Sequence, residues 1–463
     1  MAPMTEFAVN DPYRYLEGFG NYHSSEALQG AVPQVNNTPQ KPPLGLHTER
    51  ISGSAFTSPR DQYLQTFLYR GQSSLLHDDF VPLEVTSGYG AGTSAAPAHI
   101  NPNSYFWPSF PVPEQANWIT GQALLGSNGD PVKKEGTAIW VFSLTEDMPA
   151  RHVFSSLDGE LLIIPQSGSL DIQTELGFMM VRQNEIALIP RGVRYRVTLP
   201  GGKPCRGFVC ELFQGHFRLP DLGIVGTTGL ANVRDFQIPT AFFDGALVDG
   251  KAKANNKNDG GEWTIVSRLA GKLWHCTQKH TPFDVAGWHG TCYPYKFDLG
   301  RFCPLGNTLF DEHDPSLYTV LSARHHGAEP GTAVVDFVIV PPRWNVSEDT
   351  LWLPYYHRNT MQEFFSVIVN NQEPAFRFND VGRVGNRFAP FGAGLHGAMS
   401  THGASDAEMR AAQGIDTSKP KKLQTDGLTT FVLETERPLV LSEWAYACAQ
   451  KNPQAKGRLP AKM

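Results

Sequence analysis

Two histidines and one glutamate in the C-terminal part of the chain have the residue types of a metal centre that activates oxygen. His357 and Glu363 are six positions apart, and His402 follows further along. Two imidazoles and one carboxylate are the ligand set of non-haem Fe(II) oxygenases, which keep open coordination positions. Glu363 also begins the otherwise apolar run 363–369. A carboxylate in such a strand must be paired or bound, because burying it alone costs several kcal/mol.

The spacing of these residues requires a turn. Six residues of extended strand span roughly 20 Å, so His357 and Glu363 cannot share a metal along one straight strand. The polar segment 358–360, with Asn359 at its centre, predicts a turn that folds His357 back. Gly403 would let the backbone at His402 approach closely. Any one of the fifteen histidines could instead be a hydrogen-bonded structural residue, and this set could also bind zinc.

A rhythm of short strands, interrupted by Gly and Pro, precedes this region and predicts an antiparallel sandwich or jelly-roll barrel. The expected strands are 138–142, 160–165, 168–174, 185–192 and 195–199. The phrase Ile-Pro-Arg-Gly-Val-Arg-Tyr at 189–195 resembles a cupin barrel. The histidines that usually bind metal in such barrels are missing here, and only His152 lies nearby. We therefore interpret this barrel as a scaffold.

A second β-rich part begins near Val285 and contains the Glu363 run. The aperiodic stretch 376–394 is long for a loop and is expected to border a site. The first 135 residues are rich in Pro and Gly and short of apolar runs. The chain is therefore predicted to be mainly β: a two-part, cupin-like jelly-roll or β-sandwich with a loop-rich N-terminal segment. The predicted domains are 1–284, with the degenerate barrel, and 285–463, with the metal site.

Charge and sequence pattern disfavour several classes of protein. The 463 residues carry a formal charge of −6 without a basic stripe, which disfavours nucleic acid as a partner. The first residues lack a basic segment followed by an apolar one, and no run of eighteen apolar residues occurs, so secretion and membrane spanning are disfavoured.

The six cysteines form no Cys-x-x-Cys pair and are expected as free thiols in the cytoplasm. The last three residues, 461–463, loosely resemble a peroxisomal address.

Phrases spread over nearly the whole chain resemble homogentisate 1,2-dioxygenases and occur in that family's order. They are Glu-Gly-Phe-Gly-Asn (17–21), Ile-Ser-Gly-Ser-Ala-Phe-Thr (51–57), Leu-Pro-Asp-Leu-Gly (219–223), Gly-Leu-Ala-Asn (229–232), Gly-Trp-His-Gly (287–290), Asp-Phe-Val-Ile (336–339) with Pro-Pro-Arg-Trp (341–344), and Tyr-Tyr-His-Arg-Asn (355–359).

The resemblance implies one Fe(II) per subunit and a hexamer built as a dimer of trimers. His357, Glu363 and His402 match the family's iron ligands, and His289 matches its proton-accepting histidine. His396 matches a position where the family tends to carry a histidine, and we interpret it as lying beside the ligands. A hydroquinone and O2 would be the reactants, and the product from homogentisate would be maleylacetoacetate.

One departure from the family concerns substrate choice. The family continues from the ligand Glu to a Tyr nine residues on that hydrogen-bonds the substrate, whereas Gln372 stands at that position here. We expect His402, Gln372 and His396 to border the substrate. Homogentisate, gentisate and a methoxy-substituted hydroquinone all remain open as substrates. A non-catalytic cupin-like binding protein is the alternative from another class, and oxygen uptake would separate it from an enzyme.

Overall fold

The computed structural model describes most of the chain. The described residues are 11–34, 40–86, 97–221, 231–254, 261–302, 304, 318–325, 332–341, 343–345, 356–369, 376–377, 387–388, 391–403, 410, 413–419, 421–423 and 428–451. Gln372 and residues 461–463 lie outside them.

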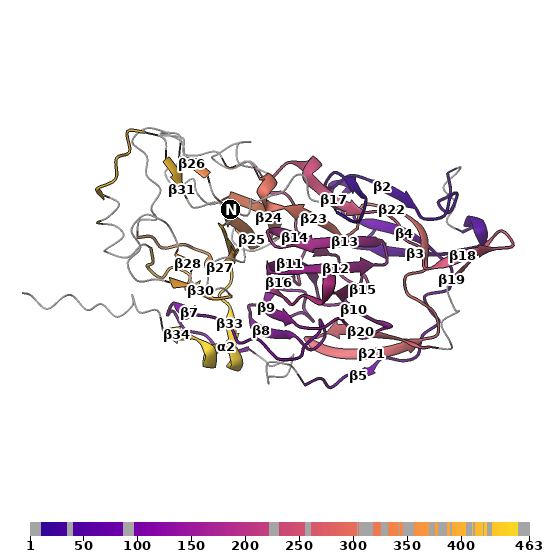
Figure 1. Cartoon of the computed structure of the whole chain (residues 1–463), viewed down its shortest axis with the longest axis horizontal. Helices are drawn as coiled ribbons and strands as arrows, with labels where there is room; N and C mark the ends of the chain where they lie inside the picture. Colours follow the sequence, from indigo (N-terminus) through magenta and orange to yellow (C-terminus); the bar gives the residue numbers. More distant parts are fainter. Residues whose placement is uncertain are drawn as a thin grey trace, which may run out of the picture.

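Two large sheets form the centre and the right-hand side of the molecule in Figure 1. The ten-stranded sheet has the order β1 (Tyr15–Glu17), β17 (Phe236–Pro239), β23 (Tyr295–Asp298), β14 (Glu185–Ile189), β11 (Glu160–Ser167), β16 (Cys205–Leu212), β9 (Thr137–Leu144), β8 (Gln122–Ser127), β33 (Val440–Ser442) and β6 (Pro97–His99). The seven-stranded sheet has the order β13 (Gly177–Arg182), β12 (Ser169–Thr174), β15 (Tyr195–Thr198), β10 (His152–Ser156), β20 (Trp263–Leu269), β21 (Lys272–Gln278) and β5 (Val81–Pro82).

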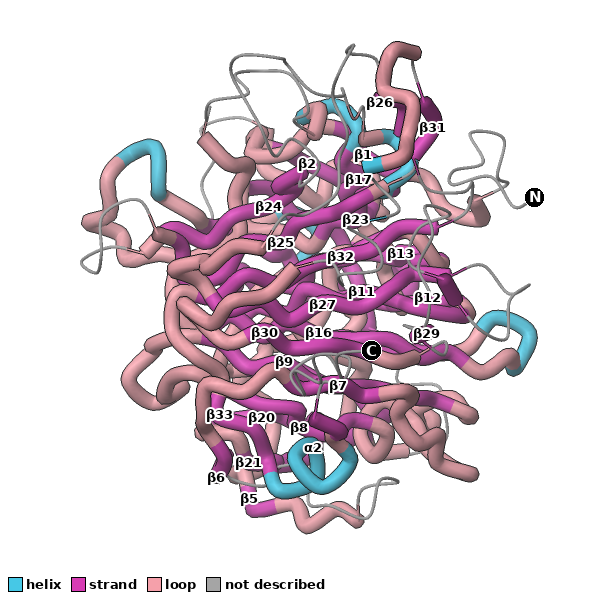
Figure 2. Tube along the Cα trace, turned by 90° about the vertical axis from the view of Figure 1, so that its left-hand side faces the viewer, coloured by secondary structure: helices cyan, strands magenta, loops and turns pink. Residues whose placement is uncertain are grey.

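A third sheet carries Glu363, one of the three candidate ligands, and lies on the left-hand side of Figure 1. Its order is β24 (Tyr318–Arg324), β25 (Ala333–Val340), β32 (Leu428–Thr435), β27 (Gln362–Val369), β30 (Ala393–His396), β7 (Tyr105–Trp107) and β34 (Gln450–Lys451). Figure 2 shows β25, β32, β27 and β30 as neighbouring strands of one layer, in agreement with their antiparallel pairing.

The remaining elements are short. A four-stranded sheet has the order β2 (His23–Glu26), β22 (Val285–Gly290), β4 (Gln65–Arg70) and β3 (His47–Ser52). Three strand pairs join β18 (Gly245–Val248) to β19 (Lys251–Ala254), β26 (Arg343–Asn345) to β31 (Lys421–Leu423), and β28 (Phe376–Arg377) to β29 (Arg387–Phe388). The helical turns are η1 (Pro43–Gly45), η2 (Arg60–Gln62), η3 (Pro200–Gly202), η4 (Val233–Asp235), η5 (Leu299–Arg301) and α2 (Glu443–Cys448).

Apolar residues on both faces of the ten-stranded sheet explain how it connects the two parts of the molecule. All residues of β9 are buried, whereas β12 alternates buried and half-buried positions. A strand covered on both faces needs an apolar run, and one covered on a single face needs alternation. Phe208 of β16 packs against Phe364 and Phe431 of the third sheet, at ring-centroid distances of 5.7 and 5.4 Å. The core therefore continues from the N-terminal sheets into the sheet that contains Glu363.

A buried ion pair lies between the ten-stranded and seven-stranded sheets. Arg268 of β20 donates to Glu211 of β16 over 2.9 Å, and the two side chains are 2% and 0% exposed. Trp140 also donates to Glu211, and Arg268 donates to Gln122.

His152, the one histidine near the barrel motif, lies at the start of β10, with its Nδ1 atom 3.1 Å from the carbonyl of Ala150.

The mainly β fold class predicted from the sequence is confirmed. The predicted domain boundary falls directly before β22, and both β22 and β23 pair with strands from the first 284 residues. Conversely, β7 of the loop-rich N-terminal segment pairs with β30 of the third sheet. The division into 1–284 and 285–463 stays a prediction about folding units, since sheet pairing crosses it in both directions.

Five of the six cysteines are free thiols, as expected, and Cys303 lies outside the described residues. Within the described part of the chain, no helix is both long enough and apolar enough to cross a membrane. The cytoplasmic location predicted from the sequence stays a prediction.

Candidate metal centre

A short antiparallel pairing brings His357 and His402 together. The His357 amide donates to the His402 carbonyl over 2.9 Å, and the His402 amide donates back over 3.1 Å. The predicted turn at 358–360 is confirmed, because the Asn359 side-chain oxygen accepts from the amide of Met361 over 3.1 Å. This turn returns the chain to Glu363, which lies near the start of β27.

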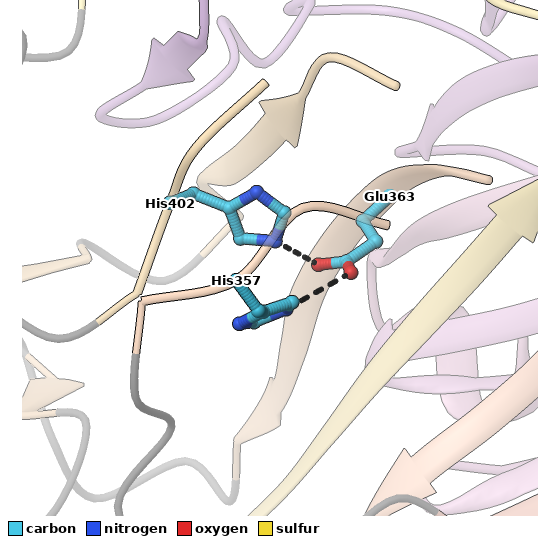
Figure 3. A group of neighbouring side chains, drawn as sticks. All are labelled: His357, Glu363 and His402. Carbon is cyan, nitrogen blue, oxygen red and sulfur yellow. Dashed lines mark ion pairs between the residues drawn. The ribbon is translucent and has the colours of Figure 1, made fainter. Parts of the chain in front are cut away.

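The three side chains converge on one point (Figure 3). Their potential ligand atoms all lie within 4.8 Å of one another. The Nε2 atom of His402 is 3.2 Å from one oxygen of Glu363, and the Nε2 atom of His357 is 3.6 Å from the other. Ligand bonds of about 2.1 Å at right angles would separate neighbouring donor atoms by about 3 Å. The spacing of the three donors therefore suits a single ion bound on one face.

The tautomer of His402 leaves its inner nitrogen available. The Nδ1 atom lies 2.8 Å from the carbonyl of Ser400, which can only accept, so Nδ1 carries the proton. The Nε2 atom is buried and has no hydrogen bond of acceptable geometry, although Glu363 is 3.2 Å away. A buried nitrogen that bears a lone pair beside a carboxylate is poorly placed for a hydrogen bond and well placed for a cation. A carbonyl that fixes a histidine tautomer in this way is a usual neighbour of metal-binding histidines.

His396 and Asn359 complete the surroundings of Glu363. β30 places His396 directly opposite Glu363, with its Nδ1 atom 3.5 Å from a carboxylate oxygen. The His396 and His402 rings are 4.1 Å apart. The Asn359 amide donates to the other oxygen of Glu363 over 3.0 Å. Sequence reasoning assigned Asn359 only to the turn, and nothing in the spacing indicated its contact with the carboxylate.

The electrostatics of this group favour an ionised carboxylate. Burial by itself would raise the pKa of Glu363, but the imidazoles of His357 and His396 lower that pKa well below its ordinary value. Burial, His402 and His357 together lower the pKa of His396, against the opposing effect of Glu363. A carboxylate surrounded by nitrogen donors supplies the negative charge that a divalent cation needs.

His289 lies in a different part of the molecule. It is on β22 in the four-stranded sheet, to the right in Figure 1, whereas β27 and β30 lie to the left. It is buried, and its two ring nitrogens contact the hydroxyls of Tyr22 and Tyr69, the latter at 2.9 Å. Burial lowers the pKa of His289. The structure thus brings together His357, Glu363, His402 and His396 within one chain, and it does not bring His289 to them.

The structure describes only part of the residues that we expect to border the substrate. Gln372, the position that departs from the family, lies outside the described residues. Of the predicted loop 376–394, the described residues are 376–377, 387–388 and 391–394, which include the short pair β28 and β29. Both predictions about substrate contacts therefore stay predictions.

Comparison with known proteins gives matches over nearly the whole chain. The family model described as "Homogentisate 1,2-dioxygenase N-terminal" matches residues 14–299, and the one described as "Homogentisate 1,2-dioxygenase C-terminal" matches residues 300–457. Proteins named homogentisate 1,2-dioxygenase are similar to this chain. The one from Emericella nidulans is 44% identical, over 97% of this chain and 94% of its own length. The one from Dictyostelium discoideum is 39% identical, over 94% of this chain and 93% of its own length.

Proposed function

The chain belongs to the homogentisate 1,2-dioxygenase family, and we propose that it is an Fe(II)-dependent enzyme that cleaves the ring of homogentisate or a close hydroquinone. The observation that carries this proposal is the convergence of His357, Glu363 and His402, with the His402 Nε2 atom buried and without a hydrogen bond. These three side chains would hold the iron. When bound, a ferrous ion with three protein ligands keeps positions open for a hydroquinone oxygen and for O2.

His396 and Asn359 would keep the ligands in place. Asn359 donates to one oxygen of Glu363, and His396 approaches the other, so the carboxylate is held in one orientation. The carbonyl of Ser400 does the same for His402. Such outer contacts fix the direction of the ligands, and the carbonyl that accepts from His402 also raises the basicity of that imidazole.

We propose that His289 accepts a proton from the substrate. Its pKa is lowered by burial, so the ring is neutral near pH 7 and has a lone pair to take a proton. A neutral imidazole has one donor and one acceptor nitrogen. The hydroxyls of Tyr22 and Tyr69 contact both nitrogens and fix the ring, so a substrate hydroxyl would have to take the place of the hydroxyl of the exposed Tyr22 to give its proton to His289.

The separation of β22 from β27 has a consequence for this role. Within one chain His289 does not approach the iron ligands, so a neighbouring copy would have to supply it. The hexamer implied by the resemblance offers such a copy. Symmetric homo-oligomers repeat one contact around an axis, so every site would be completed in the same way.

The overall reaction balances without a further reductant. The aromatic ring loses electrons and O2 gains them, while one carbon–carbon bond next to a hydroxylated carbon breaks. Both oxygen atoms end in the ring-opened product, which from homogentisate is maleylacetoacetate.

The choice of substrate stays open, because Gln372 stands where the family has a tyrosine that hydrogen-bonds the substrate. Gentisate and a methoxy-substituted hydroquinone are therefore alternative substrates. We propose that a neutral hydroquinone matches or exceeds homogentisate, since a Tyr and a Gln differ in reach and in donor number.

A panel of hydroquinones tests the proposal. The protein is reconstituted with Fe(II) without oxygen, and O2 consumption is then measured with homogentisate, gentisate and methoxyhydroquinone. Glu363→Ala is the control for oxidation by loose iron. Uptake with at least one of the three, absent from the control, is the expected result. Iron binding without uptake on any of them would indicate a binding protein instead.

A further inference from the structure

Tyr22 covers one side of His289. It lies directly before β2, which pairs with β22 and lies beside it in Figure 1. The Tyr22 hydroxyl contacts the Nδ1 atom of His289, and the centroids of the two rings are 5.7 Å apart. In one copy of the chain Tyr22 is 63% exposed, whereas His289 is 3% exposed. Tyr22 therefore separates the imidazole from the surface of the chain.

The other contacts of His289 come from residues that are held in place. Tyr69 contacts the Nε2 atom over 2.9 Å and is fully buried. Phe67 lies directly opposite His289 on β4, and the two rings stack with centroids 5.4 Å apart. The next residue of β4 after Tyr69 is Arg70, which forms a buried ion pair with Asp284, directly before β22. Within the described part of the chain, Nδ1 is therefore approached from the Tyr22 side.

The backbone on either side of Tyr22 is fixed. The carbonyl of Asn21 accepts from the hydroxyl of Tyr293 over 2.8 Å. His23 begins β2, and its Nε2 atom lies 2.8 Å from the carbonyl of Gly18. Tyr22 can thus leave His289 by rotation about its own side-chain bonds, without a movement of the loop. Exposed side chains make such rotations within picoseconds to nanoseconds.

The side chain of Tyr22 carries the same chemical group as the proposed substrate. Both have a neutral hydroxyl on an aromatic ring, because burial raises the pKa of Tyr22 and its hydroxyl keeps the proton. A hydroquinone hydroxyl that reaches Nδ1 replaces one phenol by another and gains no additional hydrogen bond there. One neutral hydrogen bond corresponds to about three- to tenfold in affinity. Tyr22 should therefore weaken substrate binding by a factor of this size.

We propose that Tyr22 is an internal competitor of the substrate at His289. In the empty site its phenol occupies the position beside Nδ1 that a hydroquinone hydroxyl must take, and it rotates outward when the substrate binds. Tyr22 thereby sets the affinity for the substrate, while His289 stays the group that accepts the proton. This inference rests on the function proposed above for His289.

Steady-state kinetics of Tyr22→Phe tests the competition. The variant keeps the aromatic ring and loses the hydroxyl, so KM for a hydroquinone is expected to fall about three- to tenfold and kcat/KM to rise. Tyr63→Phe is the matched control, because the Tyr63 hydroxyl donates to Gln65 of β4 and does not contact His289. It should keep the wild-type KM. A KM that rises or stays unchanged in Tyr22→Phe would overturn the proposal, since a hydroxyl that holds the substrate would raise KM when removed.

Carbethoxylation by diethyl pyrocarbonate gives a second measurement that needs no turnover. The reagent modifies a neutral imidazole nitrogen that it can reach, and mass spectrometry of peptides reports the rate at His289. The rate should be higher in Tyr22→Phe than in the wild type and in Tyr63→Phe. Equal rates in all three proteins would show that Tyr22 does not cover the ring and would overturn the proposal. Absence of O2 consumption by the wild type would overturn the function proposed above, and the carbethoxylation rates would then decide whether Tyr22 occupies Nδ1.

Discussion

At the scale of single residues, the candidate metal centre depends on contacts that hold each side chain in one orientation. Glu363 is approached by three imidazoles and by the Asn359 amide, while the His402 ring is fixed through the carbonyl of Ser400. Residue types and one turn were enough to predict these three side chains as one group of candidate ligands. The contact of Asn359 with the carboxylate could not be predicted, because it depends on how the turn and β27 pack.

Removal of any one ligand should release the iron. His357→Ala, Glu363→Ala and His402→Ala are each expected to lose iron and activity while remaining folded, because two protein donors cannot hold Fe(II) against water. Iron analysis and circular dichroism check both parts. His396→Gln is the comparison and should keep a full complement of iron. Iron retained in any of the three alanine variants would refute the assignment.

Asn359→Ala should weaken iron binding without changing the number of sites. Loss of an outer hydrogen bond to a ligand typically costs about 10–100-fold in metal affinity. Thr360→Ala, at an exposed position of the same turn, is the control and should bind iron as wild type does. Competition with a chelator measures the affinities. Equal affinities in the two variants would mean that the Asn359 contact with Glu363 is not needed.

His289→Gln should keep its iron and lose turnover on the order of 10²–10⁴-fold, as expected for removal of a general base. Since burial lowers the pKa of His289 below its ordinary value of 6.5, kcat/KM in the wild-type enzyme should fall as the pH drops through a value below 6.5. The residual activity of the variant should lack that decline. A structural role for His289 would instead change stability and leave the pH profile intact.

At the scale of elements, local pattern predicted strands well and sheet partners poorly. The predicted strands 138–142 and 160–165 correspond to β9 (Thr137–Leu144) and β11 (Glu160–Ser167). The apolar runs alone determine such segments. The pairing of β7 with β30, and of β22 with β2 and β4, joins residues far apart in sequence. Periodicity holds no information on such partners, so the sequence did not indicate that β22 and β27 lie in different sheets.

The ion pair between the two N-terminal sheets should be costly to break on one side. Arg268→Met would leave Glu211 buried without its counter-charge, which is expected to destabilise the fold by about 3–5 kcal/mol. Adding Glu211→Gln removes that charge and keeps an acceptor for Trp140, so the double variant should regain much of the loss. Urea denaturation of the two single variants and the double variant gives the coupling. Strictly additive losses would show that the pair acts as two independent side chains.

At the scale of the whole molecule, the separation of His289 from the metal centre predicts a site shared between copies. Subunits with His289→Gln keep the ligands, and subunits with Glu363→Ala keep the base. Mixed oligomers of the two variants should recover up to about a quarter of the wild-type rate, if subunits assort at random and one contact completes each site. Each variant alone is the control. No recovery in confirmed mixed oligomers would contradict a site shared between copies.

Isotopic labelling of the ring-opened product gives the most direct test of dioxygenase chemistry at this centre. Reconstituted protein is given its best hydroquinone under ¹⁸O2 in ordinary water, and the product is analysed promptly by mass spectrometry. We expect both atoms of one O2 molecule in the product from the wild-type protein, and no product from Glu363→Ala. A product carrying no ¹⁸O, or hydrogen peroxide formed together with a quinone, would contradict ring cleavage at the His357, Glu363 and His402 centre.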